Sequence, residues 1–164
     1  MKRENTSENC KSKKDEGASF IIHMPASAGK LICEAPEDQE IVYGKETILL
    51  VDDEKIVLET SERLLCYLGY SVIKARGGRE AVEIFSAGRD RIDLVILDLV
   101  MPEIGGELVF DTLVKIKKDV KVIISSGYSI DGKVQEVIAR GCKGFIQKPF
   151  DIKDLSSKIR EVLK

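Results

Sequence analysis

From Thr47 to the C-terminus, short apolar runs alternate with windows of helical periodicity. The runs are rich in Val, Ile and Leu and too short for helices, which predicts buried strands. Between and after them, apolar residues recur at intervals of three and four, which predicts helices. The predicted strands are 47–51, 71–74, 94–97, 121–124 and 144–146, and the predicted helices are about 55–68, 78–87, 106–117, 131–140 and 151–163.

Strands that alternate with helices in this way favour one fold class. Parallel neighbours in a sheet need crossover connections, and helices supply them on both faces of the sheet. Such crossovers are right-handed. The expected fold class is therefore α/β, with a doubly wound five-stranded parallel sheet formed by residues 46–164.

Residues 1–45 follow a different pattern. Residues 1–17 are polar and mixed in charge, as in a segment without its own core. A strand-like run, Ser19–Met24, ends at Pro25, and residues 26–44 have the composition of a linker. Because one strand is not stable alone, this run needs a sheet that is either elsewhere or missing. We expect residues 1–45 to be a tail, and a chain beginning near Lys45 to be as stable as the whole.

The net charge of −2, from 26 basic and 28 acidic residues, supplies no positive field for binding nucleic acid. No apolar run approaches the roughly 18 residues that span a bilayer, and the N-terminus lacks the apolar stretch of a signal peptide. The expected location is the cytoplasm, with no nucleic-acid partner and no membrane contact by this chain.

Polar residues follow the predicted strands. In open α/β sheets, ligands bind beyond the carboxyl ends of the strands. Asp52 and Asp53 come directly after the first run, and Asp98 follows the third. Ser126 comes after the fourth run, and Lys148 after the fifth. If the central strands are neighbours, these side chains meet at one rim of the sheet.

Three carboxylates at one rim repel one another unless a cation neutralises them. Mg²⁺ suits such a site because it takes one or two carboxylates, keeps several waters and accepts a phosphate oxygen. Lys148 and Ser126 make the rim complementary to a phosphoryl group in transfer. A carboxylate can accept that group as an acyl phosphate, and Asp98 is the best candidate because it ends a central strand.

Four stretches, each at the end of an element, resemble the receiver domain of bacterial response regulators. They are Leu50–Glu54, Leu97–Gly106, Ser126–Gly127 and Lys148–Phe150, and the resemblance covers about residues 46–164. It implies a flavodoxin-like fold with strand order 2-1-3-4-5. It also implies a phosphorelay switch that takes a phosphoryl group from a histidine kinase or phosphotransfer protein, catalysing its own phosphorylation and dephosphorylation.

The resemblance assigns the phosphoacceptor and the metal ligands. Asp98 is implied to accept the phosphoryl group. Mg²⁺ is implied to bind Asp53, Asp98 and the backbone carbonyl of Val100, with Asp52 acting mainly through metal-bound water. Val100 and Tyr128 are expected to flank the approach of the hydrolytic water. Because Val100 is apolar and Tyr128 bulky, we expect slow loss of the phosphoryl group.

The remaining roles concern the switch. Lys148 is implied to pair with the phosphoryl group, aimed inward by a cis Lys148–Pro149 bond. The hydroxyl of Ser126 is implied to follow the phosphoryl group on activation. Phe145 stands at the position of the family's aromatic switch residue, where Phe replaces the commoner Tyr. Without a hydroxyl, only the inward or outward packing of its ring can differ between the phosphorylated and unphosphorylated states.

A shorter resemblance lies in the tail. Glu16–Ala26 is similar to the closing strand of the ATP-binding domain of sensor histidine kinases, which in hybrid kinases precedes a linker and a receiver. It implies a fragment or remnant of a hybrid histidine kinase. The nucleotide-binding boxes are absent, so we do not expect phosphorylation from ATP. No output domain follows Lys164, so the output is expected to be a partner protein.

Three other classes are weighed against the receiver. A Mg²⁺-dependent aspartyl phosphotransferase or phosphatase usually needs a second acid two residues beyond its nucleophile, where Val100 stands. A flavin-binding domain needs a hydroxyl-rich loop after the first strand, where Asp52–Glu54 would repel phosphate. Gly127–Lys133 matches the spacing of a nucleotide-binding loop, but Val134 replaces the hydroxyl residue that binds Mg²⁺.

Overall fold

The computed structural model describes residues 7–13, 17–23, 40–127 and 132–164. The chain divides into two units, Met1–Glu37 and Asp38–Lys164, and each is described by itself. Within the described ranges, no helix has the length and hydropathy of a membrane span.

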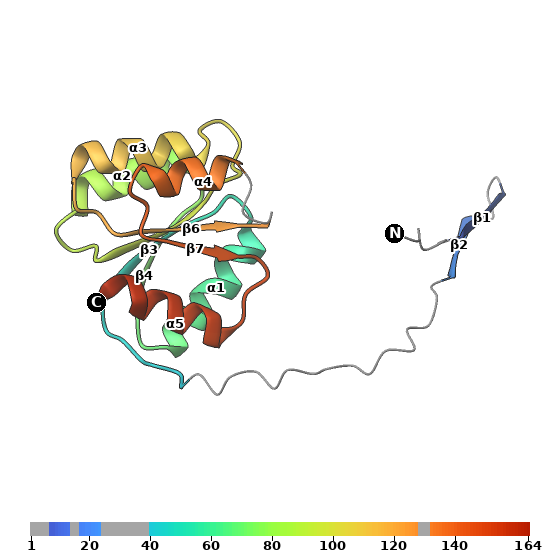
Figure 1. Cartoon of the computed structure of the whole chain (residues 1–164), viewed down its shortest axis with the longest axis horizontal. Helices are drawn as coiled ribbons and strands as arrows, with labels where there is room; N and C mark the ends of the chain where they lie inside the picture. Colours follow the sequence, from blue (N-terminus) through green and yellow to red (C-terminus); the bar gives the residue numbers. More distant parts are fainter. Residues whose placement is uncertain (1–6, 14–16, 24–39, 128–131) are drawn as a thin grey trace. The chain divides into compact units, whose positions relative to one another are not determined.

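The second unit is built on a five-stranded parallel sheet in the order β4-β3-β5-β6-β7. Counted from β3, this is the predicted order 2-1-3-4-5. The strands are β3 (Thr47–Val51), β4 (Ser71–Ala75), β5 (Leu94–Asp98), β6 (Val122–Ser126) and β7 (Gly144–Gln147). The helices are α1 (Lys55–Tyr67), α2 (Gly78–Gly88), α3 (Gly106–Ile116), α4 (Gly132–Ala139) and α5 (Ile152–Leu163). Figure 1 shows α2, α3 and α4 on one face and α1 and α5 on the other, so the doubly wound α/β fold is confirmed.

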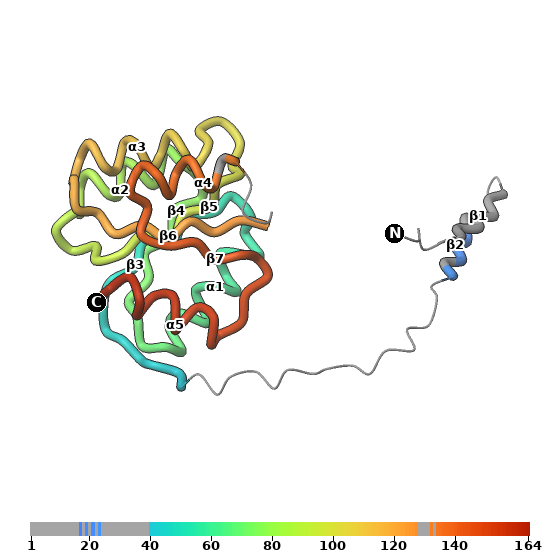
Figure 2. Tube along the Cα trace, viewed as in Figure 1, coloured from blue at the N-terminus to red at the C-terminus, as the bar shows by residue number. Residues whose placement is uncertain are grey.

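Successive strand residues pack on opposite faces of the sheet and divide the core in two. Leu49 lies in a cluster with Phe85 and Phe110 on the α2–α4 face. Leu50 lies in a cluster with Leu65 on the α1/α5 face. Fully burying such a side chain stabilises the fold by about 1.5–3 kcal/mol. The two helical layers, visible also in the trace of Figure 2, therefore hold the sheet rigidly enough to position groups at its edge.

Three of the strands run further than the apolar pattern predicts, and take in polar residues. β5 includes Asp98, and β6 includes Ser125 and Ser126. The ladder continues through them because Asp98 pairs with Ser125, and Ser126 with Gln147. The hydrogen bonds of a ladder join backbone groups, so a strand can continue through residues with polar side chains. A pattern of apolar residues alone therefore predicts strands that end too early.

The first unit contains a two-stranded antiparallel sheet of β1 (Ser7–Lys13) and β2 (Gly17–His23). β2 confirms the strand-like run predicted over Ser19–Met24, except for Met24, which lies outside the described residues. Within the polar segment 1–17, the described residues 7–13 form β1, because its backbone pairs with β2 and this pairing needs no apolar pattern. The run therefore has a partner strand within the tail itself.

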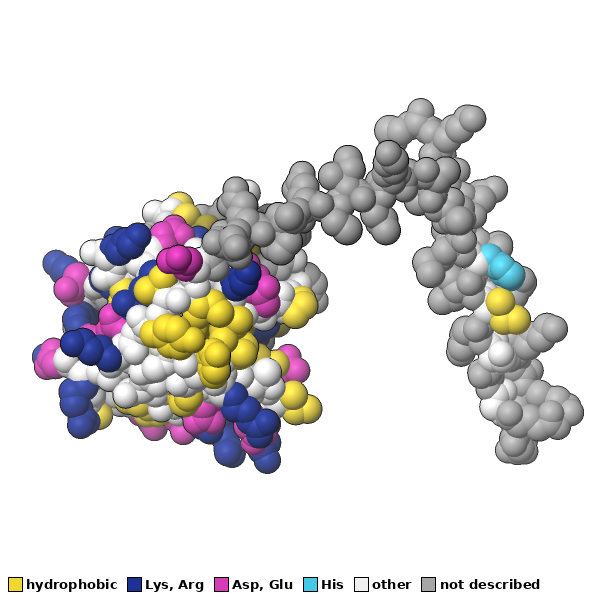
Figure 3. Space-filling view, turned by 90° about the horizontal axis from the view of Figure 1, so that it is seen from below, with side chains coloured by type: hydrophobic (Ala, Val, Ile, Leu, Met, Phe, Trp, Pro, Cys, Tyr) yellow, Lys and Arg dark blue, Asp and Glu magenta, His cyan; other side chains and the backbone are white. Residues whose placement is uncertain are grey.

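Residues 40–46, which we call the strap, are hydrogen-bonded to the rest of the second unit. The Ser156 hydroxyl accepts from the Val42 N–H and donates to the Val42 carbonyl, both at 2.9 Å. The Gly44 N–H donates to the Leu68 carbonyl at 2.9 Å. The strap is thereby attached to α5 and to the end of α1. Figure 3 views the α1/α5 face of this unit, where hydrophobic side chains gather at the surface.

The side chains of the strap add to these contacts. Ile41 packs against the α1/α5 cluster. Arg160 on α5 donates from Nη2 to Glu46 Oε2 at 2.6 Å and from Nε to the Tyr70 hydroxyl at 2.9 Å. The bond from Arg160 lowers the pKa of Glu46 to about 2. The folded unit thus includes residues N-terminal to the boundary predicted between residues 45 and 46, and the short apolar run Ile41–Tyr43 is the sequence signal for this extension.

We predict that the strap contributes to stability. A chain that begins at Glu40 should melt at the temperature of the full chain, whereas one that begins at Lys45 loses the Val42 and Gly44 hydrogen bonds and the packing of Ile41. At about 1 kcal/mol for each of these lost groups and about 4 °C per kcal/mol, the melting temperature should fall by about 12 °C. Thermal unfolding of the two truncated chains measures the difference. Equal melting temperatures would show that the strap adds nothing.

Candidate functional site

The carboxyl ends of β3 and β5 bring three carboxylates together, which we call the acidic cluster. Asp52 and Asp53 follow β3 directly, and Asp98 is the last residue of β5. β3 and β5 are hydrogen-bonded neighbours, and one carboxylate oxygen from each of the three residues lies within 4.8 Å of the others. The structure therefore assembles the three acidic residues predicted from the sequence.

The members of the acidic cluster differ in burial. Asp52 is 2% exposed and Asp98 is 5% exposed, whereas Asp53 is open to solvent. Asp52 Oδ1 accepts from the Glu54 N–H at 2.9 Å, and Oδ2 accepts from Lys148. Both Asp52 oxygens thus have protein partners, whereas Asp53 is the member of the cluster that is exposed to solvent.

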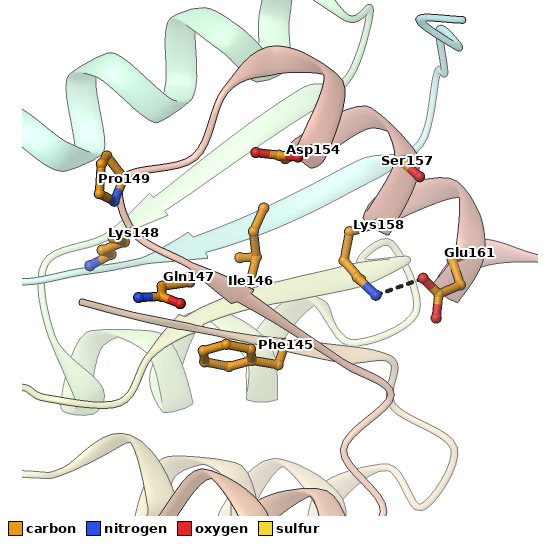
Figure 4. Close-up of a pocket in the computed structure, with 9 residues that line it drawn as sticks. All are labelled: Phe145, Ile146, Gln147, Lys148, Pro149, Asp154, Ser157, Lys158 and Glu161. Atoms are coloured by element: carbon orange, nitrogen blue, oxygen red, sulfur yellow. Dashed lines mark hydrogen bonds and ion pairs between the residues drawn. The ribbon is translucent and has the colours of Figure 1, made fainter. Parts of the chain in front are cut away.

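Lys148 places a positive charge between the two buried carboxylates. Its Nζ lies 2.6 Å from Asp52 Oδ2 and 3.3 Å from Asp98 Oδ1. Its backbone N–H donates to the Ser126 carbonyl at 2.8 Å, which ties the segment after β7 to β6. The Lys148–Pro149 bond is cis, as expected. Figure 4 shows both residues where the chain leaves β7.

The electrostatic balance at Asp98 favours the protonated form relative to an ordinary carboxyl. Burial raises the pKa of Asp98, and the charge of Asp52 acts in the same direction. Lys148 and the backbone N–H of Val100 lower this pKa and offset part of the effect. A cation bound in the cluster would stabilise the ionised form further.

The turn from β5 to α3 brings backbone close to the acidic cluster. The Gly106 N–H donates to the Leu99 carbonyl at 3.1 Å. A Cβ at Gly106 would collide with the Asp98 carbonyl, so a residue without a side chain is required there. The Val100 side chain in this turn is 59% exposed. Asp98 is therefore enclosed by backbone on the α3 side, beside an exposed apolar residue.

The two predicted switch residues lie on one face of the sheet. Ser126 is buried, and Phe145 packs partly buried against the α2–α4 cluster. Phe145 pairs with Ile124, and Ser126 lies two residues beyond Ile124, so both project toward the α2–α4 face. Figure 4 shows Phe145 on the opposite side of β7 from Ile146. Coupled motion of the Ser126 and Phe145 side chains requires that both lie on the same face of the sheet, as they do here.

Tyr128 and most of the loop that resembles a nucleotide-binding loop lie outside the described residues, in the gap 128–131. The predicted contact of Tyr128 with the hydrolytic water stays a prediction for this reason. The expectation that Gly127–Lys133 does not bind a nucleotide likewise stays a prediction.

Two surface hollows border the site. One of about 280 Å³ is lined by Asp53, Arg76, Arg79 and Glu103 among others, and opens the acidic cluster to solvent. The other, of about 510 Å³, runs along β7 and α5, with Lys148 in its lining (Figure 4). The Asp53 carboxylate can thus be approached from outside, whereas the Lys148 side chain is only 17% exposed.

Sequence reasoning missed one residue next to the acidic cluster. Ser125 on β6 is 3% exposed, and it is the register partner of Asp98. Its hydroxyl has no hydrogen-bond partner. The available signal was the period of two along a strand, which turns Ser125 and Ser126 to opposite faces.

Comparisons with known proteins agree with this geometry. The family model described as "Response regulator receiver domain" matches residues 48–160. The sensor kinase CckA of Brucella abortus is 34% identical over 94% of this chain and 17% of its own length. The chemotaxis protein CheY of Treponema pallidum is 32% identical over 71% of this chain and 82% of its own length.

A solved structure of the response regulator TrrA from Thermotoga maritima, in complex with Mg²⁺ and BeF, has a TM-score of 0.65 to this chain. It is 34% identical and covers 72% of this chain and 99% of its own. The chain spans 17% of the sensor kinase and about half of other curated relatives, so the receiver is the part that these proteins share. Fold, acidic cluster and family match lead to one conclusion: the chain belongs to the response regulator receiver domain family and serves phosphorelay signalling through that domain.

Proposed function

We propose that this receiver takes a phosphoryl group from a phosphohistidine on a histidine kinase or phosphotransfer protein and carries it on Asp98. The observation that carries this proposal is the position of Asp98. It ends a central strand, is 5% exposed, and lies 3.3 Å from the Lys148 ammonium and within the acidic cluster. It is the cluster member that combines burial with a direct contact to the backbone of the β5–α3 turn.

The donor set fits Mg²⁺, because three carboxylates within 4.8 Å form a hard oxygen site with one exposed member. We propose that Asp53, Asp98 and the Val100 carbonyl hold the ion, with Asp52 acting through its water. When bound, Mg²⁺ would neutralise charge on the phosphoryl oxygens. Asp52 keeps its hydrogen bonds to the Glu54 N–H and to Lys148, and these bonds orient its carboxylate.

In the proposed transfer, an Asp98 oxygen attacks the phosphorus atom of the phosphohistidine. A P–O bond forms as the P–N bond breaks, and the electron pair leaves with the imidazole ring. Lys148, already 3.3 Å from Asp98, needs only to turn its ammonium toward the new phosphoryl oxygens. This preorganisation lowers the reorganisation needed when charge shifts.

We propose that the signal leaves the site along the α2–α4 face. Ser126 follows the phosphoryl group with its hydroxyl, and the ring of Phe145 moves inward into the space opened on the same face. The partly buried position of Phe145 supports this step, because a ring at that depth can move either way. The receiver's output in this account is a protein that binds the altered face.

A hybrid kinase context is the second part of the proposal. The match to a sensor kinase extends over 94% of the chain, and Asp38–Lys164 is about three quarters of it, so the match includes part of Met1–Glu37. This extension supports a relation of the tail, including β2, to the kinase side of a hybrid histidine kinase. Because such kinases draw the phosphoryl group from ATP, the proposed compartment is the cytoplasm.

The aspartyl phosphatase alternative is not favoured. That class needs a second acid where Val100 stands, and Val100 is an exposed apolar residue. The flavin alternative is not favoured either, because the acidic cluster directly after β3 would repel the phosphate of the flavin.

We predict that Asp98→Asn abolishes phosphorylation. With Mg²⁺ and a small acyl phosphate, the parent should gain a single phosphoryl mass, whereas the variant should lose labelling by at least roughly 10²-fold for want of the attacking carboxylate. Intact-protein mass spectrometry measures the gain. Asp90→Asn, whose side chain is 89% exposed, is the matched control and should label like the parent. Full labelling of Asp98→Asn at another residue would contradict the assignment.

We also predict that Val100 prolongs the phosphorylated state. Its apolar side chain cannot orient the hydrolytic water, so Val100→Asn should speed loss of the phosphoryl mass by roughly 10-fold to 10²-fold. Decay of that mass in Mg²⁺ buffer is the measurement. Leu108→Asn is the control, since Leu108 is 58% exposed and lies on α3. A parent that decays within seconds, with Val100→Asn unchanged, is the opposing result.

A further inference from the structure

The hydroxyl of Ser125 is buried without a hydrogen bond. Among buried side-chain nitrogen and oxygen atoms of the described residues, Ser125 Oγ is the one that lacks a partner. Other buried serines differ: Ser156 bonds both the N–H and the carbonyl of Val42, and Ser126 has a partner of its own. Buried hydroxyls are nearly always paired, so an exception needs a physical reason.

The register places Ser125 beside the phosphoacceptor. Ser125 pairs with Asp98 on β5 and with Ile146 on β7. Paired residues of parallel strands project from the same face of the sheet. Ile96 and Ile123, two residues earlier on β5 and β6, both pack in the α1/α5 cluster. The side chains of Ser125 and Asp98 therefore leave the sheet on that face, as direct neighbours.

Lys148 also passes over this position. It follows β7, yet its ammonium reaches Asp98 on β5 and Asp52 after β3. Because β6 lies between β7 and β5, the Lys148 side chain must cross the end of β6. The Ser125 side chain thus lies in the same buried region as the Lys148 and Asp98 side chains.

In the unphosphorylated protein, other groups hold the Asp98 carboxylate. Lys148 contacts Oδ1 at 3.3 Å, and the Val100 N–H bonds to the carboxylate. Ser125 takes no part. In the transfer described above, Lys148 turns toward the phosphoryl oxygens and releases the carboxyl oxygen that it held. The Ser125 hydroxyl is the neighbouring donor on the same face that is free to replace it.

We propose that Ser125 is a positioning residue for the phosphorylated state, whose hydroxyl donates to the Asp98 carboxyl oxygen that Lys148 releases. The proposal rests on the proposed role of Asp98. An unpaired hydroxyl disfavours the unphosphorylated form, and the new hydrogen bond favours the phosphorylated one. Ser125 therefore shifts the equilibrium toward the phosphorylated conformation by two effects, a less stable unphosphorylated form and a more stable phosphorylated form.

The test is Ser125→Ala, measured with and without beryllofluoride, a stable mimic of the phosphoryl group, in Mg²⁺ buffer. Without beryllofluoride, removing an unpaired buried hydroxyl should raise the melting temperature by about 4 °C. In calorimetric titration, the apparent affinity for beryllofluoride should fall about fivefold, the equivalent of one hydrogen bond. A role in packing alone would not change the two quantities in opposite directions.

Three variants serve as controls. Ser125→Thr keeps the hydroxyl and should keep the parent's affinity. Ser126→Ala should lower the affinity without raising the melting temperature, because Ser126 already has a partner. Ser61→Ala removes a serine that is 4% exposed on α1, and should leave the affinity unchanged.

The outcomes separate the two proposals. A parent that does not respond to beryllofluoride overturns the function proposed for Asp98, and this inference with it. A parent that responds while Ser125→Ala binds equally well overturns the inference alone. A lower melting temperature for Ser125→Ala also overturns it, because the hydroxyl would then have a partner in the unphosphorylated protein.

Discussion

The contact of one ammonium group with two buried carboxylates is the interaction on which this site depends. Lys148 lies between Asp52 and Asp98, and the three side chains are mostly withdrawn from water. Two carboxylates there repel each other, and burial adds to the cost of their charge. One lysine balances only part of it, since the pKa of Asp98 remains raised. A residual negative charge of this kind suits a divalent cation and, with it, an incoming phosphoryl group.

The fold supplies this contact from three separate strands. Parallel strands end at one edge, so residues at the carboxyl ends of β3, β5 and β7 converge although they are far apart in the chain. Gly106 lets α3 start against Asp98, and the Lys148 N–H ties the last strand end to β6. Ser126 and Phe145, the proposed switch residues, lie on one face of the sheet. Ser125, the proposed positioning residue, lies on the other.

The sequence predicts most of this arrangement because apolar periodicity reports which face of an element is buried. It places the helices to within a residue or two and gathers Asp52, Asp53, Asp98 and Lys148 correctly. It fails where hydrogen bonds of the backbone decide the structure. The strand β1 and the strand ends at Ser125 are polar, and the strap is joined to α1 and α5 through hydrogen bonds of its backbone. The neighbours of the unpaired Ser125 hydroxyl depend on the register between strands, and the sequence pattern of one strand does not give this register.

Direct identification of the phosphorylated residue tests the central claim. Borohydride reduces an aspartyl phosphate to homoserine, which peptide mass spectrometry can place in the chain. After treatment with Mg²⁺ and a small acyl phosphate, we expect homoserine at Asp98 and at no other residue. Homoserine at Asp52 or Asp53, with Asp98 unchanged, would contradict it.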